Sequence, residues 1–157
     1  MYLVLIRHLL IDRFQHRERL AKYAEAVQEL ARRFLKLIAE GLGFDNHDFF
    51  DGDLSGGETL MNVNYYPPCP NPSLTMGIRP HSDRHMLTIL SQGEVSGLQA
   101  KHRGRWIPVQ PIHNAFVINF GLLMEVSHRS NPIDVLVSFI MIKESTYTPA
   151  NYICVFM

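Results

Sequence analysis

Short runs rich in β-branched and aromatic residues fill the second half of the chain, and they constrain its fold more than any other feature. The runs cover 86–90, 97–100, 106–110 and 115–120, and Gly, Pro and Asn residues separate them. Many short strands at such intervals are typical of an all-β barrel or sandwich. The basic run 101–105 lies between two of them, so we expect a charged hairpin turn there rather than a nucleic-acid patch.

The segment 58–66 predicts a further strand with two different faces. Side chains of a strand point alternately to opposite sides. One face therefore carries Met61, Val63 and Tyr65, and the other carries Leu60, Asn62, Asn64 and Tyr66. The prolines that follow at 67, 68, 70 and 72 end the strand, because proline cannot continue a central ladder.

A long amphipathic helix is predicted at about 17–42. Apolar residues recur there at intervals of three and four, from Leu20 to Leu42, and charged residues occupy the opposite face. Gly41 and Gly43 supply the stop signal. Such a stripe packs against a sheet, so we interpret the helix as scaffold and its charged face as solvated surface.

Composition excludes several classes of partner. The 157 residues suit one domain, and 15 basic against 15 acidic residues give no electrostatic reason to expect nucleic acid or an acidic membrane. The apolar opening segment is too short to span a bilayer. Two cysteines, Cys69 and Cys154, lie far apart and predict buried thiols in a reducing, cytoplasmic compartment rather than a disulfide framework.

The triplet His81-Ser82-Asp83 is the candidate for chemistry. In an extended backbone, side chains at i and i+2 point to one face, so the imidazole and the carboxylate could reach one metal ion. With one more histidine they would form the facial triad of non-haem Fe(II) oxygenases. The triplet also occurs by chance, and the spacing alone leaves that alternative open. We interpret nearby His85 as a surface or channel residue rather than a ligand.

The order NYYPPCPNP, HSD, LTIL, GLQ, RWIPVQP and NAFVINFG closely resembles the plant soluble 2-oxoglutarate/Fe(II)-dependent dioxygenases, which are isopenicillin N synthase-like. The resemblance runs from about Arg17 to Gly121. It implies a mainly β fold with a long N-terminal helix and a partial double-stranded β-helix, or jelly roll. We divide the chain accordingly into an N-terminal segment, 1–57, and a jelly-roll domain, 58–157, incomplete at its C-terminus and truncated at both ends.

The same resemblance implies an oxidoreductase that uses Fe(II) and 2-oxoglutarate, with ascorbate in support. Asn64 and Tyr66 would hydrogen-bond the 2-oxoglutarate. The substrate would be a small plant secondary metabolite such as a flavonoid or an alkaloid, which the enzyme would hydroxylate or desaturate. We expect a monomer with no nucleic-acid or membrane partner.

After Gly121 the pattern breaks. The second histidine of the family lies about 55 residues after the first, which falls near Leu136, so His128 is the nearest imidazole available as the third metal ligand. Either a deletion has brought His128 and Arg129 forward, or the tail is unrelated sequence and the His-Arg pair is accidental.

The family's Arg-x-Ser motif, whose arginine binds the far carboxylate of 2-oxoglutarate, is also missing. The run 138–141 resembles the strand that follows that motif, which would put Ile133 and Val135 at the motif positions. A catalytically inactive family member that retains only metal binding is therefore the alternative function.

Overall fold

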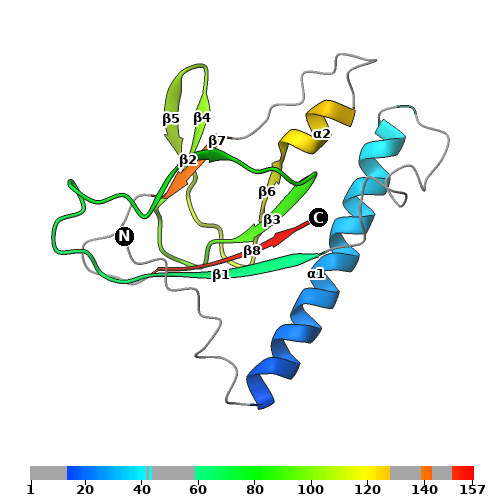
Figure 1. Cartoon of the computed structure of the whole chain (residues 1–157), viewed down its shortest axis with the longest axis horizontal. Coiled ribbons are helices and arrows are strands. Elements are labelled where there is room, and N and C mark those ends of the chain that lie inside the picture. The colour runs from blue at the N-terminus through cyan, green and yellow to red at the C-terminus, as the bar shows by residue number, and fades with distance from the viewer. Residues whose placement is uncertain (1–13, 42, 44–58, 128–138, 143–149) are drawn as a thin grey trace.

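The computed structural model describes residues 14–41, 43, 59–127, 139–142 and 150–157. Within them lie two helices, α1 (Phe14–Gly41) and α2 (Leu122–Ser127), and eight strands (Figure 1). The strands are β1 (Leu60–Tyr66), β2 (Ile78–Ser82), β3 (Leu87–Ser91), β4 (Leu98–His102), β5 (Arg105–Pro108), β6 (Val117–Phe120), β7 (Phe139–Ile142) and β8 (Ala150–Phe156). The predicted mainly β fold with one long helix before it is confirmed.

The strands form two four-stranded antiparallel sheets. One has the order β1-β8-β3-β6 and the other β2-β7-β4-β5. Eight strands in two facing sheets are the architecture of a jelly roll. The strand count among the described residues thus equals that of a whole jelly roll, although the sequence pattern breaks after Gly121.

The last strand, β8, was not predicted from the sequence. It lies between β1 and β3, and its register with β1 runs from Leu60 opposite Phe156 to Tyr66 opposite Ala150. Figure 1 shows β8 beside β1 along its whole length. A segment beyond the break in the family pattern therefore completes the sheet.

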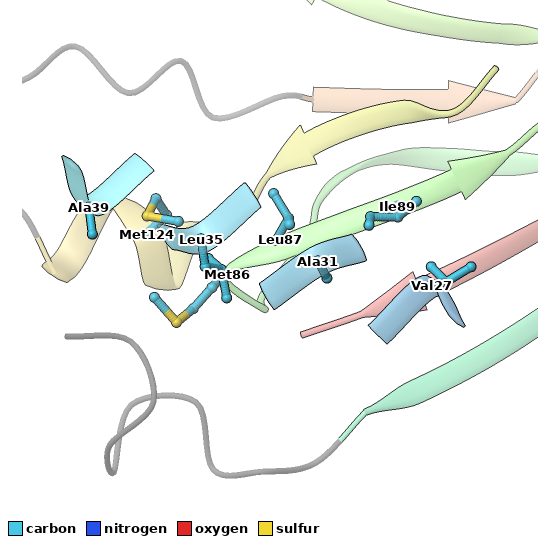
Figure 2. Packing of buried hydrophobic residues seen from close by; sticks show 8 residues of the cluster. All are labelled: Val27, Ala31, Leu35, Ala39, Met86, Leu87, Ile89 and Met124. Carbon is cyan, nitrogen blue, oxygen red and sulfur yellow. The ribbon is translucent and has the colours of Figure 1, made fainter. Parts of the chain in front are cut away.

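Helix α1 covers the outer face of the β1-β8-β3-β6 sheet. Val27, Ala31, Leu35 and Ala39, spaced four apart, are buried against Leu87 and Ile89 of β3 (Figure 2). The two alanines are fully buried, which lets the helix approach the sheet closely. The helix ends as predicted, since Gly43 has φ 77° and its N–H donates to the Glu40 carbonyl at 3.0 Å. We call the buried residues Val27, Ala31, Leu35, Ala39, Leu87 and Ile89 the outer cluster.

The opposite face of the same sheet looks into the space between the sheets. Tyr66, Leu90, Tyr152 and Cys154 are buried there with Leu98 of the second sheet. We call this group the inner cluster. Met61 packs with the outer cluster and Tyr66 belongs to the inner one, so the predicted alternation of β1 is confirmed.

Two local predictions are also confirmed. Strands β4 and β5 are joined by a two-residue turn in which Arg103 has φ 47° and Gly104 has φ 80°, a conformation typical of tight hairpins. Both cysteines are free and buried.

In the part of the chain that the structure describes, neither helix is long and apolar enough to cross a membrane.

Candidate metal site

His81 and Asp83 come together at the end of β2. The strand ends at Ser82, and the His81 Nε2 atom lies 3.5 Å from the Asp83 Oδ1 atom. Asp83 is buried, whereas the His81 side chain is 36% exposed. Two ligand atoms about 2.1 Å from one metal and about 90° apart are separated by about 3 Å. The two side chains are thus close to the arrangement that a shared cation requires.

Hydrogen bonds select which atoms face each other. His81 Nδ1 lies 2.8 Å from the Arg79 carbonyl oxygen, and because a carbonyl only accepts, Nδ1 carries the proton. Thr88 Oγ1 donates to Asp83 Oδ2 at 2.7 Å. Nε2 and Oδ1 are left to face one another. Outer partners of this kind commonly orient metal ligands.

The electrostatics of the pair favour bound positive charge. The hydrogen bond with Asp83 raises the pKa of His81 above its ordinary value, although partial burial opposes it. Burial alone would raise the pKa of Asp83, but hydrogen bonds from His81 and Thr88 outweigh it and hold that pKa below its ordinary value. Asp83 is therefore ionised at neutral pH, and a metal cation would compete with the proton of His81.

A third protein ligand is not found in the described residues, where no group of three or more His, Cys, Asp or Glu side chains could hold a metal ion. His128 lies outside those residues, so its role as third ligand stays a prediction. The ring of His85 packs against Phe156, with ring centroids 5.0 Å apart.

Asn64 and Tyr66 lie on the inner face of β1, the face on which they were predicted to lie together. Tyr66 is buried and meets the ring of Tyr152 edge-on at 5.4 Å. Asn64 is the register partner of Tyr152 on β8. Their binding of 2-oxoglutarate is still a prediction.

The strands that follow the break in the family pattern lie in different sheets, β7 in one and β8 in the other. Within the run 138–141, the described residues 139–141 belong to β7, which pairs with β2 and β4 in the sheet that does not contain β1. The strand beside Asn64 is β8, on which Tyr152 is the register partner of Asn64. Ile133 and Val135 lie outside the described residues, so their assignment to the lost motif stays a prediction.

The inner positions of β8 are neutral. Tyr152 is fully buried and its hydroxyl donates to the Val95 carbonyl at 3.1 Å. Burial raises the pKa of both Tyr152 and Cys154 to about 12, so neither ionises near neutral pH. Strand β8 itself contains no arginine or lysine that could bind a carboxylate beside Asn64.

Thr88 is the site residue that sequence reasoning missed. Thr88 lies in the run LTIL, which predicts a strand. The available signal was its alternation with Leu87 and Ile89, which pack on the outer face and so leave Thr88 pointing inward. Its contact with Asp83, five residues earlier, depends on the turn between β2 and β3.

Comparison with known proteins places this geometry in context. Residues 57–134 match the 2OG-Fe(II) oxygenase superfamily. Mugineic-acid 3-dioxygenase of Hordeum vulgare is 49% identical over 110 residues, which are 70% of this chain and 32% of that protein. Hyoscyamine 6-dioxygenase of Hyoscyamus niger is 45% identical over 114 residues, 71% of this chain and 32% of that protein. The chain thus spans about a third of the length of these relatives.

Solved structures resemble most of the chain. The crystal structure of JOX2 in complex with 2OG, Fe and JA superposes with a TM-score of 0.83 at 29% identity, over 91% of this chain and 42% of that one. The 2-oxoglutarate complex of dioxygenase for auxin oxidation 1 from Arabidopsis thaliana gives a TM-score of 0.81 at 26% identity, over 92% of this chain and 53% of that one. Both likenesses extend over about nine-tenths of this chain.

Proposed function

The chain belongs to the 2OG-Fe(II) oxygenase superfamily. We therefore propose that it binds Fe(II) through His81 and Asp83 and acts as a 2-oxoglutarate-dependent dioxygenase that hydroxylates or desaturates a small plant metabolite. One observation carries the proposal. His81 Nε2 and Asp83 Oδ1, the two atoms left without other hydrogen bonds among the described residues, face each other at 3.5 Å.

The donor set fits Fe(II). Imidazole nitrogen suits iron, and with a single carboxylate it forms the protein part of the non-haem oxygenase site. When bound, Fe(II) with 2-oxoglutarate supplies the activation of dioxygen and the oxidising power. Two residues of the chain orient the metal ligands. The Arg79 carbonyl holds the proton of His81 on Nδ1, and Thr88 binds one oxygen of Asp83 so that the other stays available.

The fit for 2-oxoglutarate is partial. The amide of Asn64 and the phenol of Tyr66 lie on one inner face and offer hydrogen bonds to a carboxylate. The neighbouring strand β8 offers no cation. A charge-assisted hydrogen bond contributes about 1.5–3 kcal/mol, so binding without it is weaker by about one to two decades.

That same absence of a cation on β8 favours a second candidate function. A family member that retains the metal pair but binds 2-oxoglutarate too weakly for turnover would be catalytically inactive and would still bind metal. The two candidates differ in one measurable property, the response of bound Fe(II) to 2-oxoglutarate.

The substrate class is proposed from the relatives alone. Those relatives are named for mugineic acid, a flavonoid and hyoscyamine, which are all small molecules. We propose a flavonoid- or alkaloid-like metabolite, ascorbate as a supporting reductant, and a cytoplasmic monomer.

Anaerobic Fe(II) titration tests the proposal. With 2-oxoglutarate present, we expect a visible charge-transfer absorption that disappears in His81→Ala. Fe(II) binding that is lost in His81→Ala but gives no such absorption would favour the inactive metal-binding protein. Binding that does not depend on His81 would contradict both.

A further inference from the structure

Gly121 packs against the turn that carries Asp83. A Cβ atom at position 121 would overlap the carbonyl oxygen of His85 and would lie 2.9 Å from the carbonyl oxygen of Asp83. All of these neighbours are backbone atoms, which cannot move aside as the end of a flexible side chain can. Any residue larger than glycine must therefore displace the turn 83–85.

The need for glycine here is spatial. Gly43, Gly93 and Gly104 have positive φ values, a conformation in which glycine is favoured over other residues. Gly121 does not have a positive φ value. By contrast, a Cβ at Gly41 or Gly104 would meet nothing within 4 Å. Gly121 is thus distinguished by close approach of two backbones.

Two hydrogen bonds join the same segments. The N–H of Leu122 donates to the Asp83 carbonyl at 2.8 Å, and the N–H of Gly121 donates to the Met86 carbonyl at 3.0 Å. Leu122 is the first residue of α2, so its N–H has no partner within the helix and is available for Asp83. The turn is therefore held on both sides of Arg84 and His85.

We propose that Gly121 and the Leu122 amide form a backbone clamp that positions the Asp83 carboxylate for metal binding. Thr88 fixes the side chain of Asp83, and the clamp fixes its main chain. Metal ligands must lie within about 0.2 Å of their bonding distances, so a displaced turn moves Asp83 out of the arrangement that it shares with His81. Gly121 is in this sense a positioning residue, and the inference rests on the proposed metal site.

Two variants remove different parts of the clamp. Gly121→Ala introduces the overlapping Cβ. Leu122→Pro removes the N–H that donates to the Asp83 carbonyl oxygen, and proline is well tolerated at the first position of a helix. The Leu122 side chain is 40% exposed, so its loss alone should cost little. The second variant keeps the test valid if the first does not fold.

The controls separate positioning from stability. Gly41→Ala adds a methyl group in open space, and Val27→Ala truncates a buried side chain of the outer cluster beside Ile89, at the end far from Met86 (Figure 2). For each purified variant of the 157-residue chain, anaerobic Co(II) titration gives the affinity and the visible d–d spectrum, and thermal unfolding without metal gives the stability.

We expect Co(II) affinity to fall about 10- to 100-fold in Gly121→Ala, as it does when outer partners of metal ligands are lost, and by a smaller factor in Leu122→Pro. The d–d spectrum should change in both. Val27→Ala should lose thermal stability but keep the native affinity and spectrum. Native affinity and spectrum in both clamp variants would overturn the clamp alone. Absence of His81-dependent Co(II) binding in the unmodified chain would overturn the metal site and the clamp together.

Discussion

The two faces of the β1-β8-β3-β6 sheet differ in the interactions that their side chains make. The outer face is apolar and is covered by α1 (Figure 2). The inner face mixes apolar residues with Thr88, Asn119 and Tyr152. Among the described residues, Asn119 Nδ2 is buried without a hydrogen-bond partner. One sheet therefore separates an apolar face that packs against α1 from a face that also buries polar groups.

The difference has an energetic cause. An apolar side chain needs only to leave water, and any well-packed neighbour suffices. A buried polar group needs a partner of the right chemistry at hydrogen-bond distance, and an unpaired one costs about 1–3 kcal/mol. Substitutions on the outer face should thus change stability alone, whereas substitution of Thr88, the inner-face residue that contacts Asp83, should also change metal binding.

Leu35→Ala should give the largest loss of stability. It removes a buried side chain where α1 meets the sheet, and such truncations cost about 2–5 kcal/mol. Urea unfolding should show the loss, and Co(II) affinity should stay native. A drop in Co(II) affinity would mean that the helix also shapes the site.

Thr88→Val should affect both properties. It leaves one oxygen of buried Asp83 without its donor, at a cost of about 1–3 kcal/mol, and it should weaken Co(II) binding about tenfold. Its neighbour Ile89 points to the outer face, so Ile89→Val is the matched control and should cost about 0.5–1.5 kcal/mol with native metal affinity. Equal metal affinities in the two variants would contradict the contrast between the faces.

Tyr152→Phe should have a smaller effect. It removes the hydrogen bond to the Val95 carbonyl but keeps the ring against Tyr66, so we expect a loss of about 0.5–1.5 kcal/mol in urea unfolding. Because no charge is removed, Co(II) affinity should not change. A larger loss would show that the phenol organises more of the inner cluster than its single hydrogen bond indicates.

The pH dependence should be the smallest effect, since His81 is partly exposed. The raised pKa of His81 contributes stability that is complete below its ordinary value of 6.5 and is lost as pH rises through the raised value. The lowered pKa of Asp83 contributes stability that is complete above its ordinary value of 3.8 and is lost as pH falls through the lowered value.

The metal-free pair should therefore stabilise the fold most between about pH 4 and 6.5. Urea unfolding across pH for the native chain and His81→Ala would measure this difference. Co(II) affinity should change in the opposite sense, rising with pH as His81 loses its proton. A native chain and a His81→Ala variant with parallel stability profiles would show that the pair does not interact.

Features that depend on local order were predictable from the sequence. The helix stripe, the alternation of β1 and the hairpin turn at Arg103 all arise from residues within a few positions of each other. The pair His81 and Asp83 was predictable for the same reason, because i and i+2 residues share a face in extended backbone. The jelly roll itself followed from the family resemblance.

The tertiary structure alone decided which distant segments meet. The place of β8 beside β1, the hydrogen bond from Thr88 to Asp83 and the contact of Gly121 with the same turn join segments up to 96 residues apart. Nothing in the local pattern of 150–156 states which strand it pairs with, because any edge of an open sheet offers the same backbone groups. Sequence determined which residues could bind a metal, and long-range strand pairing decided how they are held.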